Sequence, residues 1–310
     1  MKRVTVFGGS GFVGRYIVKR LAAQGSIVRV AVRDPEHALF LKPMGAVGQI
    51  APVHGDVRNE ASVRAAASGC DAVINAVGFW NSSRAGFDAV HHHGAERVAR
   101  ISRELGVDRF VHLSGIGAKV SSASGYIVAR ARGEAAVQSA FPGAILLQPS
   151  AIFGQEDRLL NLMGRICRDA PIFPVIAGDT KLQPVYVGDV AEAAVSALRK
   201  QGHVYQLGGP RVYRHSELID LVMQMCRRPR RRINLPMGLA SFMAGIFALL
   251  PGPTPLSKDT LALLRDDNVV EEGVAGLETL GITPMAVDAI APCYLDQYRP
   301  GGRFRPARMA

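Results

Sequence analysis

The sequence has 310 residues, of which 48% are hydrophobic and 20% charged. This composition is typical of a globular protein and excludes a disordered or fibrous chain. The formal net charge is +11, from 37 basic and 26 acidic residues. Such an excess favours anionic partners, namely phosphorylated cofactors, acidic lipids or acidic protein surfaces. We expect no nucleic-acid partner, because no recognition motif with interleaved aromatic residues accompanies the charge.

The cysteines have no paired spacing along the chain; they are Cys70, Cys167, Cys226 and Cys293. They indicate neither a metal site nor a disulfide framework, and they are typical of a reducing compartment. Because the chain enters a strand directly, we expect no signal peptide and a cytoplasmic location.

The first predicted unit is a strand, a glycine-rich turn and a helix. Residues 4–7 form a short apolar run, and apolar residues recur at helical spacing from Val13 towards Gly25. Glycines at three-residue spacing between them allow a tight turn, let the backbone approach a pyrophosphate and expose the amides of the helix N-terminus. The alternative is a glycine-rich connection without a ligand. We expect a nicotinamide dinucleotide, contacted by Gly8, Ser10, Gly11, Phe12, Val13 and Gly14.

The second strand is predicted over residues 27–32 and ends at Arg33-Asp34. In a dinucleotide fold an acidic residue here holds the 2′-hydroxyl of NAD, whereas an arginine accommodates the 2′-phosphate of NADP. Because Arg33 comes first, we favour NADP(H) over NAD(H). Arg15 could add a second positive charge. The alternative for both arginines is ordinary solvated surface.

Four more strands are predicted in the first 150 residues. They cover residues 49–54, 72–76, 109–114 and 144–148. Strands that alternate with helices predict an α/β fold with a Rossmann-type, doubly wound parallel sheet, whose ligand crevice lies at the carboxyl ends of the strands.

Residues that directly follow these strands are candidate cofactor contacts. Asp56 and Val57 follow the third strand, where we expect the adenine edge. Ala76 and Gly78 close the fourth strand, and a glycine there lets the backbone approach the cofactor. Pro149 follows the sixth strand.

A helix is predicted from Arg84 to Gly106, and it contains His91-His92-His93. Three histidines in a row suggest a metal cluster. Consecutive helical positions, however, point about 100° apart and cannot converge on one ion. We therefore expect no metal and a structural role for His91 near the sheet.

Ser114 ends the fifth strand, and Tyr126 and Arg130 follow on a predicted helix. Ser114 and Tyr126 would both face the crevice. Together with the glycine motif and Asn75-Ala-Val-Gly78, they resemble the short-chain dehydrogenase/reductase superfamily in its atypical or extended branch. The resemblance implies that Tyr126 moves a proton, that Ser114 steadies the substrate oxygen, and that Arg130 stands at the position of a lysine that holds the cofactor ribose.

The arginine leaves two readings open. Arg130 can hydrogen-bond a ribose and favour a phenolate. It cannot release a proton, so a relay through that side chain is lost. A cofactor-binding protein without turnover and an active enzyme with Ser114, Tyr126 and Arg130 as its catalytic residues therefore both fit.

Further motifs resemble, more closely, the family of the nucleotide-binding (thirty-nine-kilodalton) accessory subunit of respiratory complex I and its bacterial relatives. They are Leu41-Lys-Pro-Met-Gly45, Gly48-Gln-Ile50, Phe153-Gly-Gln-Glu-Asp-Arg158 and Gln183-Pro-Val-Tyr-Val-Gly-Asp189. The resemblance implies a bound, structural NADPH, complex I subunits as partners and a small, mostly helical C-terminal lobe. We predict a Rossmann core over 1–155, remaining sheet elements and the lobe over 156–298, and a basic tail over 299–310.

Residues 227–250 are a candidate membrane contact. An arginine cluster at 227–232 precedes an apolar stretch whose helical part is limited to about a dozen residues by prolines and a glycine. That length is too short to span a bilayer, which needs about 20 residues. The stretch could lie in the interface with its charges on anionic headgroups, or form a buried lobe helix beside a solvated basic turn.

Taken together, these features predict an NADP(H)-binding protein with a structural or assembly role at a membrane-associated respiratory complex. It would be cytoplasmic or peripheral on the inner face of the cytoplasmic membrane. The alternative is an active NADPH-dependent oxidoreductase or isomerase that acts on a lipophilic, quinone-pathway-like substrate.

Overall fold

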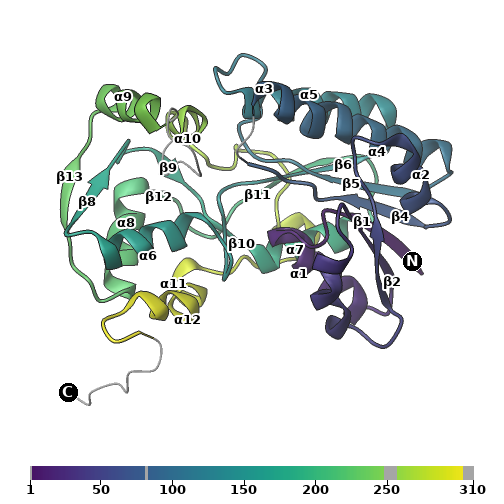
Figure 1. Ribbon diagram of the computed structural model, residues 1–310, viewed down its shortest axis with the longest axis horizontal. Helices are drawn as coiled ribbons and strands as arrows, with labels where there is room; N and C mark the ends of the chain where they lie inside the picture. The colour runs from purple at the N-terminus through teal and green to yellow at the C-terminus, as the bar shows by residue number, and fades with distance from the viewer. Residues whose placement is uncertain (1, 81–82, 248–256, 303–310) are drawn as a thin grey trace. The chain divides into compact units, whose positions relative to one another are not determined.

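The computed structural model describes residues 2–80, 83–247 and 257–302 (Figure 1). The chain forms two compact units, each assembled from separate stretches of sequence. Unit 1 comprises Met1–Pro149, Val187–Leu207 and Val270–Thr283, and unit 2 comprises Ser150–Tyr186, Gly208–Val269 and Pro284–Ala310. The predicted domain boundary near residue 155 stays a prediction.

Unit 1 is built on a sheet of seven parallel strands in the order β11-β6-β5-β4-β1-β2-β3. The strands are apolar and buried, as expected where helices cover both faces. The strand order reverses between β1 and β4, the point at which open α/β sheets bind ligands. The strands are β1 (Arg3–Phe7), β2 (Ile27–Val32), β3 (Ile50–His54), β4 (Ala72–Asn75), β5 (Arg109–Leu113), β6 (Ile145–Pro149) and β11 (Val204–Leu207).

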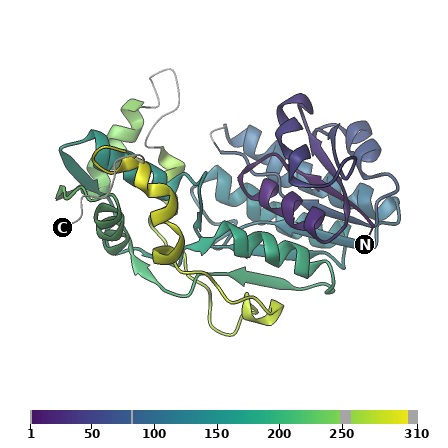
Figure 2. The ribbon, with the colours of Figure 1, turned by 90° about the horizontal axis from the view of Figure 1, so that it is seen from below.

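Helices cover both faces of this sheet. Helices α1 (Phe12–Ala23) and α7 (Val187–Ala197) lie side by side on one face (Figure 2). The other face packs a continuous apolar core against α2 (Glu60–Ala67), α4 (His93–Glu104) and α5 (Gly125–Ala140). The predicted Rossmann-type, doubly wound sheet is confirmed. The short helical turns of unit 1 are η1 (Glu36–Met44), α3 (Arg84–Phe87), η2 (Asp88–His92) and η3 (Glu278–Leu280).

Unit 2 is mostly helical and has its own core, formed mainly by α6, α8, α11 and α12. Its helices are α6 (Leu159–Asp169), α8 (His215–Met225), α9 (Met237–Phe247), α10 (Lys258–Leu263), α11 (Val287–Ile290), α12 (Pro292–Leu295) and η4 (Asp296–Tyr298). Three pairs of short strands complete it: β7 (Ile152–Phe153) with β10 (Val185–Tyr186), β8 (Ile172–Val175) with β13 (Arg231–Asn234), and β9 (Lys181–Leu182) with β12 (Tyr213–Arg214).

The helix predicted from Arg84 to Gly106 is wrong as a single element. The structure divides it into α3, the π-helical turn η2 and α4. Helix α5 packs closely against this turn at Gly133, where a Cβ would lie only 2.0 Å from the carbonyl oxygen of His91. The widened turn pushes that carbonyl towards α5, and only a glycine leaves room for it.

The helical spacing of the apolar residues predicts a helix from Gln155 to Asp169, but helix α6 begins later, at Leu159. The carboxylate of Asp157 accepts hydrogen bonds from the backbone N–H groups of Leu160 and Asn161, at 2.7 and 3.2 Å, so it fixes the first turn there. The seventh strand of the sheet, β11, was not among the six strands predicted in the first 150 residues.

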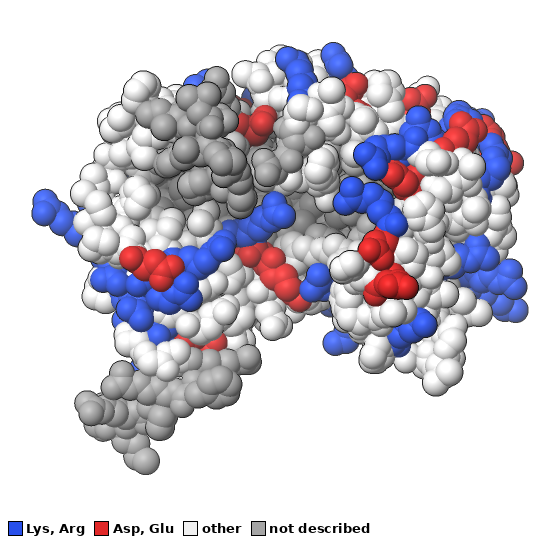
Figure 3. Space-filling model, in the orientation of Figure 1, with Lys and Arg blue, Asp and Glu red and all other residues white. Residues whose placement is uncertain are grey.

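The candidate membrane contact spans β13 and α9, and its residues 248–250 lie outside the described residues, as do residues 303–310 of the predicted tail. The basic cluster ends in strand β13 rather than in a turn. Figure 3 shows basic side chains along unit 2 with acidic side chains among them. Over the described ranges, no helix has the length and apolar character that crossing a bilayer requires.

Candidate functional site

The glycine turn joins β1 to α1 with almost no space for side chains. Gly8 has a positive φ of 74°, and Gly11 N–H donates a hydrogen bond to Gly8 O at 3.0 Å. A Cβ on Gly14 would lie 2.2 Å from Gly8 O. Helix α1 therefore starts directly against the end of β1, a placement that only glycine permits.

The N-terminus of α1 is open to an anion. Its N-cap is Gly11, which supplies no side-chain hydrogen bond, and its first turn, which begins with Phe12 and Val13, carries no acidic residue. The amides of this turn and the positive end of the helix dipole suit a phosphate group. The backbone around Gly8 to Gly14 thus fits the pyrophosphate of a dinucleotide.

The end of β4 and the side chain of Arg15 lie next to this glycine turn, and together they form what we call the phosphate cradle. A Cβ on Gly8 would lie 2.8 Å from Ala76 O, so β1 and the end of β4 meet at bare backbone, whereas Gly78 has open space where its Cβ would be. The guanidinium of Arg15 donates to Ser10 O at 3.2 Å and lies 5.2 Å from the ring of Phe40. A positive charge therefore lies over the glycine turn.

Two residues follow β2: Arg33 is exposed to solvent, and the carboxylate of Asp34 makes hydrogen bonds. The carboxylate of Asp34 accepts hydrogen bonds from the N–H groups of Glu36 and His37 and pairs with the His37 ring at 2.6 Å. These contacts, with the His37 side chain first, lower the pKa of Asp34. The Asp34 carboxylate thus caps the first turn of η1.

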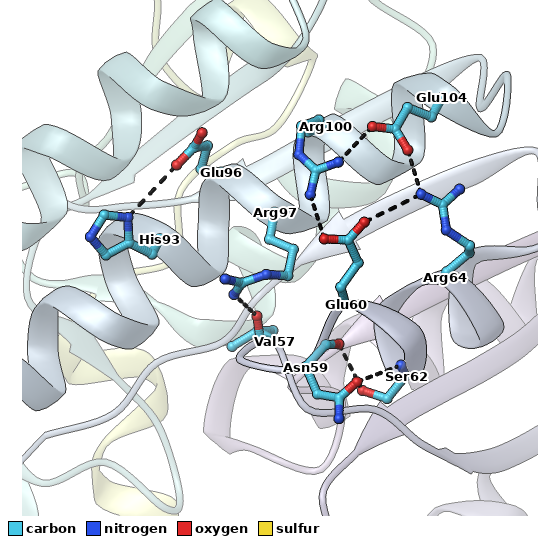
Figure 4. Close-up of polar contacts among 10 residues, drawn as sticks. All are labelled: Val57, Asn59, Glu60, Ser62, Arg64, His93, Glu96, Arg97, Arg100 and Glu104. Atoms are coloured by element: carbon cyan, nitrogen blue, oxygen red, sulfur yellow. Dashed lines mark hydrogen bonds and ion pairs between the residues drawn. The ribbon is translucent and has the colours of Figure 1, made fainter.

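The residues after β3 are held by arginines. Arg58 pairs with Asp56 at 2.6 Å and, as the largest of several causes, lowers the pKa of Asp56. Val57 is buried, and its carbonyl accepts a hydrogen bond from Arg97 at 2.7 Å (Figure 4). Next to it, an exposed ion-pair network links α2 to α4 and adds little stability; it consists of Glu60, Arg64, Arg100 and Glu104.

Tyr126 lies in the first turn of α5 within a cluster of rings. Its ring centroid is 4.5 Å from that of Trp80, 5.5 Å from Phe87 and 5.2 Å from His91. Its hydroxyl accepts a hydrogen bond from Arg130, whose guanidinium carbon is 5.3 Å from the same ring. A phenol that accepts this bond keeps its own proton for another acceptor.

His91 has the structural role that was predicted. It is 7% exposed, and its Nε2 lies 3.0 Å from Phe79 O. Burial and the charge of Arg130 lower its pKa to about 4. The prediction that consecutive histidines point in different directions is wrong for His92 and His93. Their rings stack, with centroids 4.2 Å apart.

Ser114 lies beside a buried polar set that the sequence analysis did not identify. The backbone N–H of Ser114 donates to Leu147 O at 2.7 Å, and Arg130 lies against the following residue, Gly115. Glu134, one turn after Arg130, accepts a hydrogen bond from Gln148 at 2.9 Å. Arg130 thus contacts Tyr126 and lies against the residue that follows Ser114, whereas Arg33, Asp56 and Val57 follow strands in the other half of the sheet.

Three buried polar atoms of this set have no hydrogen-bond partner within the described part of the chain. They are His112 Nδ1, Ser114 Oγ and Glu134 Oε1. Burial raises the pKa of Glu134, and burial together with Arg130 lowers the pKa of His112 to about 3. An unmet buried polar atom costs roughly 1–3 kcal/mol. The set therefore favours a bound molecule or water that supplies these bonds.

The spacing of residues in the sequence could have identified Glu134. Tyr126, Arg130 and Glu134 recur every four residues, which places them on one face of α5. No comparable signal marked His112, Gln148 or Gln206. They lie on three different strands, and only the strand order brings them beneath α5.

Replacing Glu134 by glutamine is expected to raise stability more at pH 8 than at pH 4. A folded-state pKa raised above the unfolded value means that the folded state holds the proton more tightly, so stability falls as pH rises through the folded pKa. Glutamine keeps the bond to Gln148 without this penalty. Urea unfolding of both proteins at the two pH values tests this, and a difference independent of pH would contradict it.

Comparison with known proteins places this site in a class. A family profile described as NAD(P)H-binding matches residues 8–140. The fold is shared with a UDP-glucose 4-epimerase from Thermus thermophilus, solved in complex with NAD, at a TM-score of 0.68 and 18% identity over 96% of this chain and 98% of that chain. Residues 8–140 therefore match an NAD(P)H-binding domain, on a fold that the chain shares with this epimerase.

Relatives at higher identity give the family. The chain is 36% identical over 314 residues to an Arabidopsis thaliana protein, "NADH dehydrogenase [ubiquinone] 1 alpha subcomplex subunit 9, mitochondrial", with 96% of this chain and 78% of the relative covered. It is 32% identical to the Neurospora crassa "NADH-ubiquinone oxidoreductase 40 kDa subunit", covering 95% and 79%. This chain belongs to the family of these complex I subunits.

A reductase is also similar over a shorter span. The Caulobacter vibrioides "Ceramide reductase" is 30% identical over 198 residues, which covers 63% of this chain and 61% of that protein.

Proposed function

We propose that this protein binds NADP(H) as a structural cofactor and supports the assembly or stability of a membrane-associated respiratory complex. The observation that carries the proposal is the family membership over nearly the whole chain, combined with an intact phosphate cradle between β1 and α1. The cofactor would join the glycine turn, the ends of β4 and β6 at Ala76, Gly78 and Pro149, and the Tyr126–Arg130 pair.

The preference for NADP(H) rests on the residues after β2. The carboxylate of Asp34 is engaged with η1, so it is a poor ligand for a ribose 2′-hydroxyl. Arg33 is exposed at the end of the strand, where a 2′-phosphate would need a cation. Arg15, over the glycine turn, adds to the positive potential.

Replacing Arg33 by alanine is expected to weaken NADPH binding by about 10- to 100-fold, the value of one charge-assisted hydrogen bond. NADH binding should change little, because NADH lacks the 2′-phosphate. Titration calorimetry with both nucleotides measures this, with Arg168→Ala as a control that removes an exposed arginine of unit 2 already paired with Asp169. Equal losses for both nucleotides would refute the NADP(H) preference.

The alternative function is an active NADPH-dependent oxidoreductase or isomerase on a lipophilic substrate. Tyr126 with an available proton and Ser114 with an unpartnered hydroxyl favour it, as does the similarity to a ceramide reductase. Against it stands Arg130, which cannot pass a proton onward.

Tyr126→Phe separates the two functions. For a structural cofactor, the variant should bind NADPH within about fivefold of the wild type, since one neutral hydrogen bond is worth about 1 kcal/mol. Neither protein should then oxidise NADPH with quinones or carbonyl compounds. Wild-type turnover that falls by about 100-fold or more in Tyr126→Phe, the usual effect of losing a general acid, would establish the enzyme instead.

We also propose peripheral contact with a membrane or with complex I subunits through β13 and α9. Arg231 and Arg232 are exposed on β13, and Leu239 and Phe242 of α9 are 49% and 67% exposed while Ala240 is buried. Cations beside exposed apolar side chains suit an anionic interface. Vesicles with anionic lipid should carry the protein in flotation, and neutral vesicles should not; co-purification with complex I subunits tests the protein partners.

A further inference from the structure

The π-helical turn η2 gives the histidine run a geometry that an α-helix would not. The turn is closed by an i→i+5 hydrogen bond from His93 N–H to Asp88 O. In such a widened turn, positions i+4 and i+5 lie on the two sides of position i, whereas α-helical positions i and i+5 diverge. His92 and His93 therefore flank Asp88. Single π turns within helices occur frequently at functional sites.

The three side chains converge on one small volume. His92 Nδ1 lies 3.1 Å from Asp88 Oδ1, and His93 Nε2 lies 3.3 Å from Asp88 Oδ2. One ligand atom from each residue can be chosen so that all lie within 4.8 Å of one another. A tetrahedral zinc ion with bonds of about 2.0–2.2 Å has ligand atoms about 3.3–3.6 Å apart. Each imidazole nitrogen lies near this distance from a different oxygen of the Asp88 carboxylate.

A carboxylate lies near each nitrogen of His93. Its Nε2 faces Asp88, and its other nitrogen, Nδ1, lies 3.8 Å from the carboxylate of Glu96 (Figure 4). A carboxylate that hydrogen-bonds the second nitrogen is the usual means of orienting a ligating histidine; Glu96 is beyond hydrogen-bond distance here and contributes its negative charge. The His93 side chain is 54% exposed, so an ion can reach the site from solvent.

One charge opposes a cation here. Arg132 Nη1 on α5 lies 3.8 Å from Asp88 Oδ1 and is itself 52% exposed. An exposed arginine pair of this kind is weak, and the flexible side chain can swing into solvent. Arg132 therefore competes with a metal for the carboxylate without blocking the site.

We propose that Asp88, His92 and His93 form a binding site for a divalent transition-metal ion of the zinc type, with one carboxylate and two imidazole ligands and an open position. This ligand set suits Zn²⁺, whereas Mg²⁺ and Ca²⁺ prefer oxygen ligands. His91 is not a ligand, because its ring is buried towards Phe79 and Tyr126. The proposal does not depend on the proposed function.

The site is connected to the ring cluster around Tyr126. The same turn that carries the ligands on its outer side places Phe87 and His91 against Tyr126 on its inner side, at 5.5 and 5.2 Å. A bound ion would cross-link positions 88, 92 and 93 and so fix the turn. Trp80, the single tryptophan of the chain, contacts Phe87 and Tyr126 and can report this change by fluorescence.

The test is titration of the chelator-treated full chain with Zn²⁺ alone, in competition with a chromophoric indicator. All proteins carry Cys293→Ser, which removes the exposed thiol as a ligand. We expect one saturable site with a Kd of about 10 μM or tighter. His92→Ala and His93→Ala should each weaken Zn²⁺ affinity at least about tenfold, because even the loss of a residue that only hydrogen-bonds to a metal ligand usually has this effect. Arg132→Ala should tighten it.

His37→Ala is the matched control, because His37 pairs with Asp34 at 2.6 Å on the surface but was not found in a cluster of three ligands among the described residues. It should leave Zn²⁺ affinity unchanged. Circular dichroism and urea unfolding show whether each variant folds, and Co²⁺ in place of Zn²⁺ should give a tetrahedral visible spectrum only with both histidines present. Absence of saturable binding in the wild type, or unchanged affinity in a folded His92→Ala/His93→Ala double variant, would overturn the proposal.

Discussion

Replacing Gly14 by valine is expected to abolish binding of nicotinamide dinucleotides. The new Cβ would lie 2.2 Å from Gly8 O and 2.7 Å from Gly9 Cα, and both are backbone atoms that cannot rotate away. Helix α1 must then move off β1, and the amides of its first turn leave the phosphate position. We expect a loss of NADPH affinity of about 100-fold or more, which is about 2.8 kcal/mol or more.

Titration calorimetry with NADPH and NADH measures this loss, and both nucleotides should be affected equally because the pyrophosphate is common to them. Gly238→Ala in α9 is the control, since its Cβ meets open space and its backbone is helical. Gly78→Ala is more informative: its Cβ also meets no protein atom, so any loss of affinity arises from the cofactor itself. A Gly14→Val protein that binds either nucleotide normally would refute the phosphate cradle.

Replacing His112 by leucine is expected to make the protein markedly more resistant to acid. His112 is 6% exposed, and burial, Arg130 and His91 hold its pKa at about 3, against 6.5 for the ordinary group. Between these two pKa values the imidazole is protonated in the unfolded chain but neutral in the folded chain. The free energy of unfolding therefore falls as pH falls below 6.5. At pH 5 this difference costs the wild type about 2 kcal/mol relative to neutral pH.

Leucine does not titrate, and it also removes the unpartnered Nδ1. Between pH 7 and pH 5 the free energy of unfolding of the variant should therefore fall by about 2 kcal/mol less than that of the wild type. Urea unfolding at both pH values gives the two losses. The same pH dependence in His112→Leu as in the wild type would show that His112 is protonated in the folded protein.

The sheet and the glycine turn could be predicted because their signals are local. Apolar runs of the right length mark β1 to β6, and the three glycines follow β1 within seven residues of sequence. Helix boundaries were less accurate where a side chain decides them, as Asp157 does for α6. The resemblance to the complex I subunit family drew on motifs spread over much of the chain, and relatives matching nearly all of it confirm that family.

Other features depend on contacts that are distant in sequence. The π turn η2 exists where Gly133 of α5 meets the carbonyl of His91, 42 residues earlier (133 − 91). The buried set around Ser114 needs β5, β6 and β11 to be neighbours beneath α5. No periodicity within one segment reveals either arrangement, and for this reason the histidines were misjudged and Glu134 was missed.

The division of unit 1 among three separate stretches of the chain affects how the protein is made. Until β11 has been synthesised, β6 is an uncovered edge, and such edges promote association between nascent chains. Gln206 in β11 then receives its backbone partner, Ala275, only after a further 69 residues (275 − 206). Because unit 1 extends to Thr283, it cannot close before that point has been synthesised, and fragments that stop near residue 155 should aggregate during expression.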